Sequence, residues 1–136
     1  MRRPIASFTT AAVALALAGA SSAAAQACLK ADSTAAVKIT GTLTLVKFVH
    51  PGNGSRQQAY VIRLPKPVCA DVTDIDDKVQ RVTKIGRVQL AGELDAKAVD
   101  TLMNKRVTVG GTLFGQHTAY HIAPILVSLK SIDPAK

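Results

Sequence analysis

Hydrophobic and polar residues alternate along five stretches of this chain, which is the pattern of β-strands that bury one face. The first stretch, residues 37–49, is the longest, and its alternation changes phase at Val46, after a central glycine, Gly41. A phase change and an internal glycine are typical of a bent or bulged strand. The second stretch is expected to end at Leu64, because Pro65 cannot donate a backbone hydrogen bond. The predicted strands after the first are 59–64, 84–91, 107–113 and 125–129.

Between the third and fourth predicted strands the period of the pattern changes. Residues 93–105 place Val99, Leu102 and Met103 on one helical face, and Asp95 stands where its carboxylate can cap the N-terminus. Five strands with one short helix between strands 3 and 4 is the order of the OB-fold, a small, partly open β-barrel. The predicted fold class is therefore mainly β and OB-like. A five-stranded α+β sandwich of other topology is the alternative.

The N-terminal part of the chain differs in composition from the rest. Two arginines precede an apolar run at 11–20, and small residues lead to Ala25 and Ala27. A charged start, a short apolar core and small residues at A-x-A spacing are typical of a secretory signal peptide. An apolar run of about ten residues is too short to span a bilayer, which needs about 20. We expect 1–27 to be a signal peptide, cleaved after Ala25 or Ala27, and 28–136 to be one exported domain without a membrane span.

The presequence is of the bacterial type, so the mature domain is expected to be periplasmic or secreted. The sequence has two cysteines, Cys28 and Cys69, and both lie in the mature part. Two cysteines in an exported chain predict one disulfide, because the compartment is oxidising. Closing the loop between them would stabilise the fold by about 3–4 kcal/mol. Lipidation is the alternative fate of Cys28.

Charge and aromatic content narrow the range of partners. The chain has 17 Lys and Arg against 9 Asp and Glu, and the mature domain keeps a net charge of 15 − 9 = +6, since Arg2 and Arg3 are removed. Single-stranded nucleic acid is bound by several stacking aromatics, but aromatic residues are 4% of this chain and tryptophan is absent. A nucleic-acid partner is therefore not expected. An anionic component of the cell envelope, either a glycan or an acidic protein patch, suits a basic exported domain better.

OB-folds bind extended ligands across the face of their second and third strands. Basic residues lie within or beside both of these predicted strands and accompany one tyrosine. The predicted ligand face consists of Tyr60, Arg63, Lys66, Arg81, Lys84 and Arg87. No catalytic constellation accompanies it, since the mature chain has no nucleophile elbow and a single glutamate, Glu93. We expect a non-enzymatic binding protein, and a purely structural or interaction protein is one alternative.

A metal-binding module is a second alternative. His117 and His121 stand four residues apart in the turn between the last two predicted strands. Two imidazoles at this spacing converge on one ion if the turn is compact, and a transition metal normally takes a third ligand. His50 is the remaining histidine. No cofactor other than such a metal ion is expected, and two histidines in a hairpin turn are also typical of ordinary polar loop residues.

Three segments together resemble a bacterial family of domains of unknown function, number 4431. They are YVIRLPKPVC at 60–69, VQL at 88–90, and VTVGGTLF at 107–114 with His117 and Thr118 after it. The resemblance runs from Cys28 to Ile132 and implies a small exported OB-like domain, a cysteine after the second strand, and no assigned activity. The family is typically His-rich at three successive positions where this chain has Tyr120, His121 and Ile122. This departure weakens any metal site inferred from the family.

Overall fold

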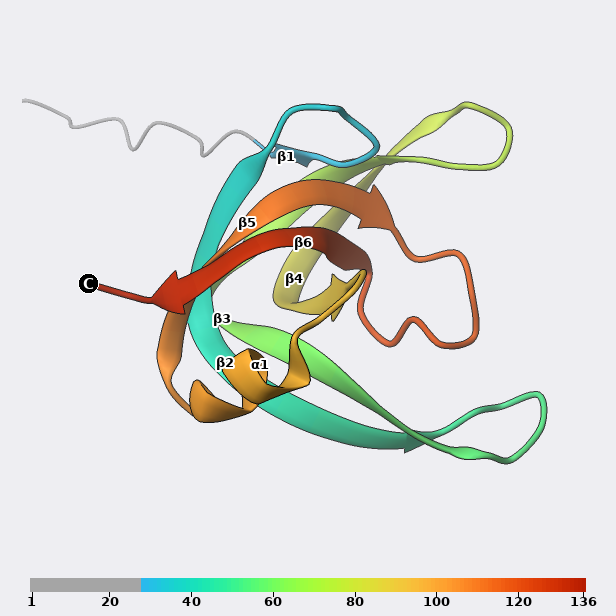
Figure 1. Cartoon of the computed structure of the whole chain (residues 1–136). Helices are drawn as coiled ribbons and strands as arrows, with labels where there is room; N and C mark the ends of the chain where they lie inside the picture. The colour runs from blue at the N-terminus through green and yellow to red at the C-terminus, as the bar shows by residue number, and fades with distance from the viewer. Residues whose placement is uncertain (1–27) are drawn as a thin grey trace, which may run out of the picture.

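The computed structural model describes residues 28–136, and the predicted signal peptide, 1–27, lies outside the described residues. Residues 28–136 form six strands and one short helix (Figure 1). No helix in this part of the chain is long and apolar enough to cross a membrane. In chain order the elements are β1 (Leu29–Lys30), β2 (Val37–Val49), β3 (Arg56–Thr73), β4 (Val79–Ala91), α1 (Ala96–Thr101), β5 (Arg106–Gly115) and β6 (Ile125–Pro134).

The five long strands close into a ring. β2 pairs antiparallel with both β3 and β5, β3 pairs antiparallel with β4, and β5 pairs antiparallel with β6. A parallel pairing between β4 and β6 completes the ring, and α1 lies between β4 and β5 in the chain. This strand order and this helix position are those of the OB-fold. The predicted OB-like barrel is confirmed, and the alternative sandwich is not the fold.

The core lies inside the ring and is built from aliphatic side chains. Alternate residues of a strand point to opposite faces of the sheet, so each strand contributes every second residue to the core. Beyond the ring, the β2–β3 hairpin extends past this core, and Val49 near its end is 62% exposed. Each long strand supplies a fully buried side chain, namely Leu43, Ile62, Ile85, Leu113 and Ile125.

β2 belongs to both halves of the barrel because it changes partner along its length. Residues 37–42 pair with β5 and residues 42–49 pair with β3, so Thr42 is paired on both sides. Gly41 lies beside this point, where an added Cβ would come within 2.6 Å of Ile62 Cγ2. The strand curves through this region, as Figure 1 shows, in agreement with the bent strand that the sequence predicts. Glycine is required here because the neighbouring strand approaches too closely for a side chain.

The predicted end of the second strand is wrong. β3 does not end at Leu64 but continues to Thr73. The two prolines within 64–67 have no N–H to give to the ladder, and these four residues bulge opposite the single residue Gly86. The prolines therefore interrupt the pairing with β4 without ending the strand.

The predicted helix cap is present. The Asp95 carboxylate accepts hydrogen bonds from the backbone N–H groups of Lys97, at 3.1 Å, and Ala98, at 3.4 Å. Val99 is the buried residue of the helix. The helix is shorter than the predicted stretch, because Asn104 takes a positive φ of 61° and its N–H bonds to the carbonyl of Leu43 in β2. The chain is thereby turned directly into β5.

The predicted disulfide between Cys28 and Cys69 is present, with 4.7 Å between the two Cα atoms. It lies beside the short parallel pairing in which Leu29 and Lys30 of β1 meet Ala70 and Asp71 of β3. The bond therefore fastens the beginning of the described chain to the C-terminal half of β3.

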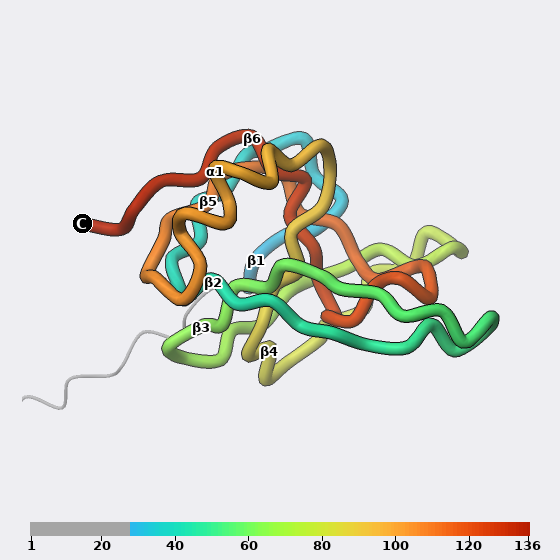
Figure 2. The backbone as a smooth tube through the Cα atoms, turned by 60° about the horizontal axis from the view of Figure 1, so that its bottom comes forward, coloured from blue at the N-terminus to red at the C-terminus, as the bar shows by residue number. Residues whose placement is uncertain are grey.

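Three connections project from the same side of the barrel (Figures 1 and 2). They are the β2–β3 turn at 50–55, the β3–β4 turn at 74–78 and the β5–β6 loop at 116–124. In both views the β5–β6 loop lies between the two hairpins. The loop between the last two strands, which helps to bind ligands in OB-folds, thus lies beside the two hairpins.

Replacing Gly41 by alanine is expected to destabilise the protein by about 1–3 kcal/mol, because the new methyl group has no space beside Ile62. Gly86→Ala is the matched control, since no atom lies within 4 Å of the position of its Cβ. The control is expected to change stability by about 0.5 kcal/mol or less. Urea unfolding of both variants measures the difference, and equal stabilities would contradict the close approach.

Loss of the disulfide is expected to cost about 4 kcal/mol, since the bond closes a loop with a sequence separation of 41. The double variant Cys28→Ser/Cys69→Ser should unfold at a clearly lower urea concentration than the oxidised protein. When a reductant is added to the oxidised protein, its urea midpoint should fall toward that of the double variant. Unfolding curves that do not respond to the reductant would show that the bond does not form in solution.

Candidate functional site

Two arginines meet on the outer face of the barrel. Arg63 of β3 and Arg87 of β4 are direct cross-strand partners. Their chain neighbours Ile62 and Val88 are buried in the core, so the arginine side chains point outward. Both arginines are exposed. The structure therefore brings together two of the six residues of the predicted ligand face.

A hollow of about 350 Å³ adjoins this pair. Two of its lining residues are apolar, the half-buried Val46 and Val61, which at 2% exposure presents almost no surface to the hollow. Gly86 leaves the side of β4 open, with no atom near the place where its Cβ would be. The hollow combines a small apolar surface with two cationic groups. The residues that line it are Thr44, Val46, Val61, Arg63, Gly86 and Arg87.

Tyr60 lies on the other face of β3. It has the same strand parity as the buried Ile62, and its hydroxyl donates a hydrogen bond of 2.8 Å to Asp100 Oδ1 on α1. This hydrogen bond to the carboxylate, followed by burial, raises the pKa of Tyr60 above its usual value. Tyr60 therefore attaches the helix to the barrel and does not accompany Arg63.

None of the other three residues of the predicted ligand face is a cross-strand partner of the arginine pair. Arg81 forms an ion pair with Asp71, with 2.8 Å between Nε and Oδ1, and the hydrogen bond from Arg81 lowers the pKa of this carboxyl. Lys66 lies in the proline bulge of β3, and Lys84 takes a positive φ of 56° at an irregular point of β4. These residues are exposed, and their place in the predicted ligand face stays a prediction.

The β5–β6 loop is held against the outer face of β4 by a glutamine that the sequence analysis missed. Gln89 is 7% exposed, and its Nε2 donates to the carbonyl of Tyr120 at 3.1 Å. Its Oε1 accepts from the N–H of Ile122 at 2.7 Å, and Arg87 Nη2 donates to the carbonyl of the same residue at 2.6 Å. Ala123, near the end of the loop, is fully buried. The only indication in the sequence is a polar residue between the core residues Val88 and Leu90.

The two histidines of this loop pack together with Phe114. The ring centroids of His117 and His121 are 4.7 Å apart, and each lies 5.7 Å from that of Phe114. His121 Nδ1 accepts a hydrogen bond from the backbone N–H of His117 at 3.1 Å. His117 Nδ1 lies 3.1 Å from the carbonyl of Gly115, and since a carbonyl only accepts, this nitrogen carries the proton. One nitrogen of each ring is therefore used by the backbone.

His50 stands apart from this pair. Its ring packs on Tyr120, with 4.4 Å between the centroids, and its Nδ1 accepts from the N–H of Gly52. Within residues 28–136, no group of three or more His, Cys, Asp or Glu side chains is arranged to hold a metal ion. The structure thus brings His117 and His121 together without His50, and the predicted metal site stays a prediction.

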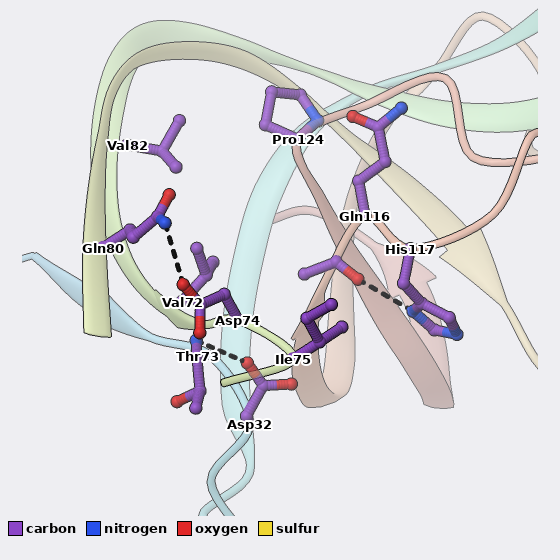
Figure 3. A pocket seen from close by; sticks show the side chains of 11 residues that line it. Asp32, Val72, Thr73, Asp74, Ile75, Gln80, Val82, Gln116, His117 and Pro124 are labelled. Carbon is purple, nitrogen blue, oxygen red and sulfur yellow. Dashed lines mark hydrogen bonds between the residues drawn. The ribbon is translucent and has the colours of Figure 1, made fainter. Parts of the chain in front are cut away.

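A second hollow, of about 780 Å³, opens between the β3–β4 hairpin and the β5–β6 loop (Figure 3). Its two carboxylates are engaged by the backbone, since Asp32 Oδ2 accepts from the N–H of Thr73 and Asp74 Oδ1 from the N–H of Lys78. The hydrogen bond from Lys78 lowers the pKa of Asp74. These groups stabilise the hairpin. The hollow is lined by Asp32, Val72, Thr73, Asp74, Ile75, Gln80, Val82, Gly115, Gln116, His117 and Pro124.

Comparison with known proteins identifies part of this chain. The model of a family described as "Domain of unknown function (DUF4431)" matches residues 87–133. The resemblance to DUF4431 is confirmed over this segment. It begins at Arg87 and contains Gln89, His117 and His121, whereas Arg63 lies outside it. The DUF4431 segment thus supplies the β5–β6 loop and the residues that hold the loop in place.

No curated protein matches this sequence. Among solved structures, one match is to the Plasmodium falciparum SSB complex with ssDNA, at 17% sequence identity and a TM-score of 0.34. The match covers 74% of this chain and 92% of that chain. A TM-score this low supports no conclusion about the present chain, and the OB-like assignment rests on the strand pairings described above.

The histidine pair predicts a pH-dependent stability. Burial, followed by the charge of His117, lowers the pKa of His121 below its usual 6.5. Because the unfolded state then takes up the proton more readily, the contribution of His121 to stability is complete above pH 6.5 and is lost as the pH falls through the folded-state pKa. His121→Asn, which keeps an acceptor, should lose less stability between pH 7 and pH 5 than the unaltered protein. Urea unfolding at both pH values measures this, and an NMR titration with a folded pKa at or above 6.5 would contradict it.

Proposed function

We propose that this domain is a non-enzymatic binding module of the cell envelope, and that it binds an anionic glycan on the outer face of β3 and β4. The single observation that carries the proposal is the pair Arg63 and Arg87, two like charges placed directly opposite each other. Like charges in this position destabilise a sheet. A destabilising pair of like charges that no described carboxylate neutralises is typical of a binding surface.

The surroundings of the pair support an anionic ligand. Within residues 28–136 the ion pair between Arg81 and Asp71 is the one salt bridge, so neither Arg63 nor Arg87 is neutralised by a described carboxylate. The adjoining hollow offers the half-buried Val46 as a small apolar surface. A charged sugar has an apolar C–H face and anionic substituents, and this combination matches the hollow and its arginines.

The placement of the aromatic side chains argues against nucleic acid as the ligand. Single-strand binding proteins stack successive bases on several aromatic rings. Tyr60 faces away from the arginines, and Phe114 and Tyr120 pack on histidine rings. Phe48 is the remaining phenylalanine or tyrosine of residues 28–136, and one ring is a poor stacking platform.

An envelope location fits the chemistry of the domain. A disulfide between Cys28 and Cys69 persists in an oxidising compartment. The residues before it, 1–27, have the composition of a bacterial signal peptide. Periplasmic or secreted localisation is part of the proposal. Detection of the disulfide-bonded domain in a periplasmic fraction would support it.

The experiment is a binding titration with a heparin-like sulfated polysaccharide against the variant Arg63→Gln. Loss of a charge-assisted hydrogen bond is expected to weaken binding about tenfold or more. The same substitution should leave stability unchanged or slightly raised, because it relieves the repulsion with Arg87. Binding by the unaltered protein should weaken between about 0.05 and 0.5 M salt, since screening shortens the reach of the charges.

Arg56→Gln is the matched control, because Arg56 is an exposed arginine on the same strand whose parity places it on the opposite face from Arg63. Equal binding by the two variants would contradict the proposed face. Neutral dextran should not bind. Tight binding of a polyglutamate peptide without binding of the sulfated polysaccharide would replace the glycan by an acidic protein partner.

A further inference from the structure

The arginine pair continues across two more strands. Thr42 of β2 is the cross-strand partner of Arg63 on one side and of Arg106 of β5 on the other. Directly opposed residues of neighbouring strands point to the same face of a sheet. Arg87, Arg63, Thr42 and Arg106 therefore form one row across β4, β3, β2 and β5, which we call the arginine row. Arg106 was not part of the predicted ligand face.

Two hollows open along the arginine row, and Arg63 lines both of them. The first is the hollow of about 350 Å³ beside Arg87. The second has a volume of about 160 Å³ and is lined by Gly41, Thr42, Arg63, Leu64, Pro65 and Arg106. At about 30 Å³ per water molecule, the second hollow has room for about five waters, which is enough for one tetrahedral oxyanion.

The hollow of about 160 Å³ is cationic. Arg63 and Arg106 are both exposed and form no ion pair within residues 28–136. The carboxylate of Asp133 lies one row away, opposite Thr108, and is not in salt-bridge contact with Arg106. Thr42 adds a hydroxyl between the two guanidinium groups. A guanidinium group binds phosphate or sulfate through two parallel N–H donors, and a hydroxyl provides a further donor.

We propose that the glycan carries phosphate or sulfate groups at two positions and lies across the strands, with one oxyanion between Arg87 and Arg63 and the other between Arg63 and Arg106. Neighbouring strands are about 4.8 Å apart, so Arg63 and Arg106, two strands apart, are separated by about 10 Å. The two oxyanions must therefore be spaced by about this distance or less. This inference rests on the proposed function. It adds the kind of substituent on the glycan, the spacing of its two oxyanions and the direction in which the glycan crosses the strands.

The test compares Arg106→Gln with the adjacent Lys105→Gln in titrations with two oligosaccharides of equal length, one with a single sulfate group and one with two sulfate groups about 10 Å or less apart. Both substitutions remove one positive charge, but Lys105 precedes β5 and lies outside the arginine row. Arg106→Gln is expected to weaken binding of the doubly sulfated oligosaccharide about tenfold and to change binding of the singly sulfated one little. Lys105→Gln should change neither affinity appreciably. Circular dichroism is the control that checks whether both variants are folded.

The outcomes separate this inference from the proposed function. If Arg63→Gln weakens binding while Arg106→Gln and Lys105→Gln behave alike, the second oxyanion position is wrong and the binding face stands. If Arg63→Gln has no effect, the binding face and this inference both fail. A polycarboxylate glycan of equal charge that binds as tightly as the sulfated one would overturn the choice of phosphate or sulfate.

Two sources of phosphate are distinguished by a further pair of titrations. A soluble linear polyphosphate and vesicles of an anionic phospholipid both present phosphate groups, but the vesicle presents them as a surface. Binding of the soluble polyphosphate with the same dependence on Arg106 supports recognition of a phosphorylated chain. Binding of vesicles alone would overturn the glycan and assign the arginine row to a lipid headgroup surface.

Discussion

The barrel depends on one strand that has different partners at its two ends. β2 pairs with β5 up to Thr42 and with β3 from Thr42 onward. This change of partner joins the β2–β3–β4 hairpins to the β5–β6 hairpin, and the pairing of β4 with β6 then closes the ring. The strands approach so closely at this point that Gly41 can carry no side chain. The same junction sets the surface chemistry, since the partners of Thr42 on its two sides are Arg63 and Arg106.

Local features of the sequence were sufficient for most of the fold. The alternation in 37–49 depends on the residues of that strand alone, and the cap at Asp95 depends on bonds to the next two or three residues. The end of β3 could not be predicted in this way. Prolines usually mark the end of a strand, and here the strand continues because residues 64–67 bulge opposite Gly86 of β4 and pairing resumes at Val68. That partner is distant in the sequence and is known only once the strands are paired.

The binding surface was less predictable than the fold because it depends on parity and register together. Parity alone places Tyr60 on the face of the buried Ile62 and opposite to Arg63. The exclusion of Tyr60 from the ligand face could therefore have been predicted from the sequence. The meeting of Arg63 with Arg87 requires the register of β3 against β4, and Arg106 joins them only through β2. Three arginines far apart in the chain thus form one row that no single segment indicates.

Arg87 has two tasks that a single guanidinium group can perform together. One of its five N–H donors bonds the carbonyl of Ile122 and helps Gln89 to hold the β5–β6 loop. The remaining donors are free to meet an anion beside Arg63. A guanidinium group that is already fixed by the loop loses less side-chain entropy when a ligand arrives, so the loop contact favours binding as well as stability. A lysine at this position would be a single flexible point charge and could not bind the loop and a bidentate oxyanion with the same rigidity. The DUF4431 segment therefore contributes to the proposed site through orientation as well as charge, because its loop fixes the first arginine of the row.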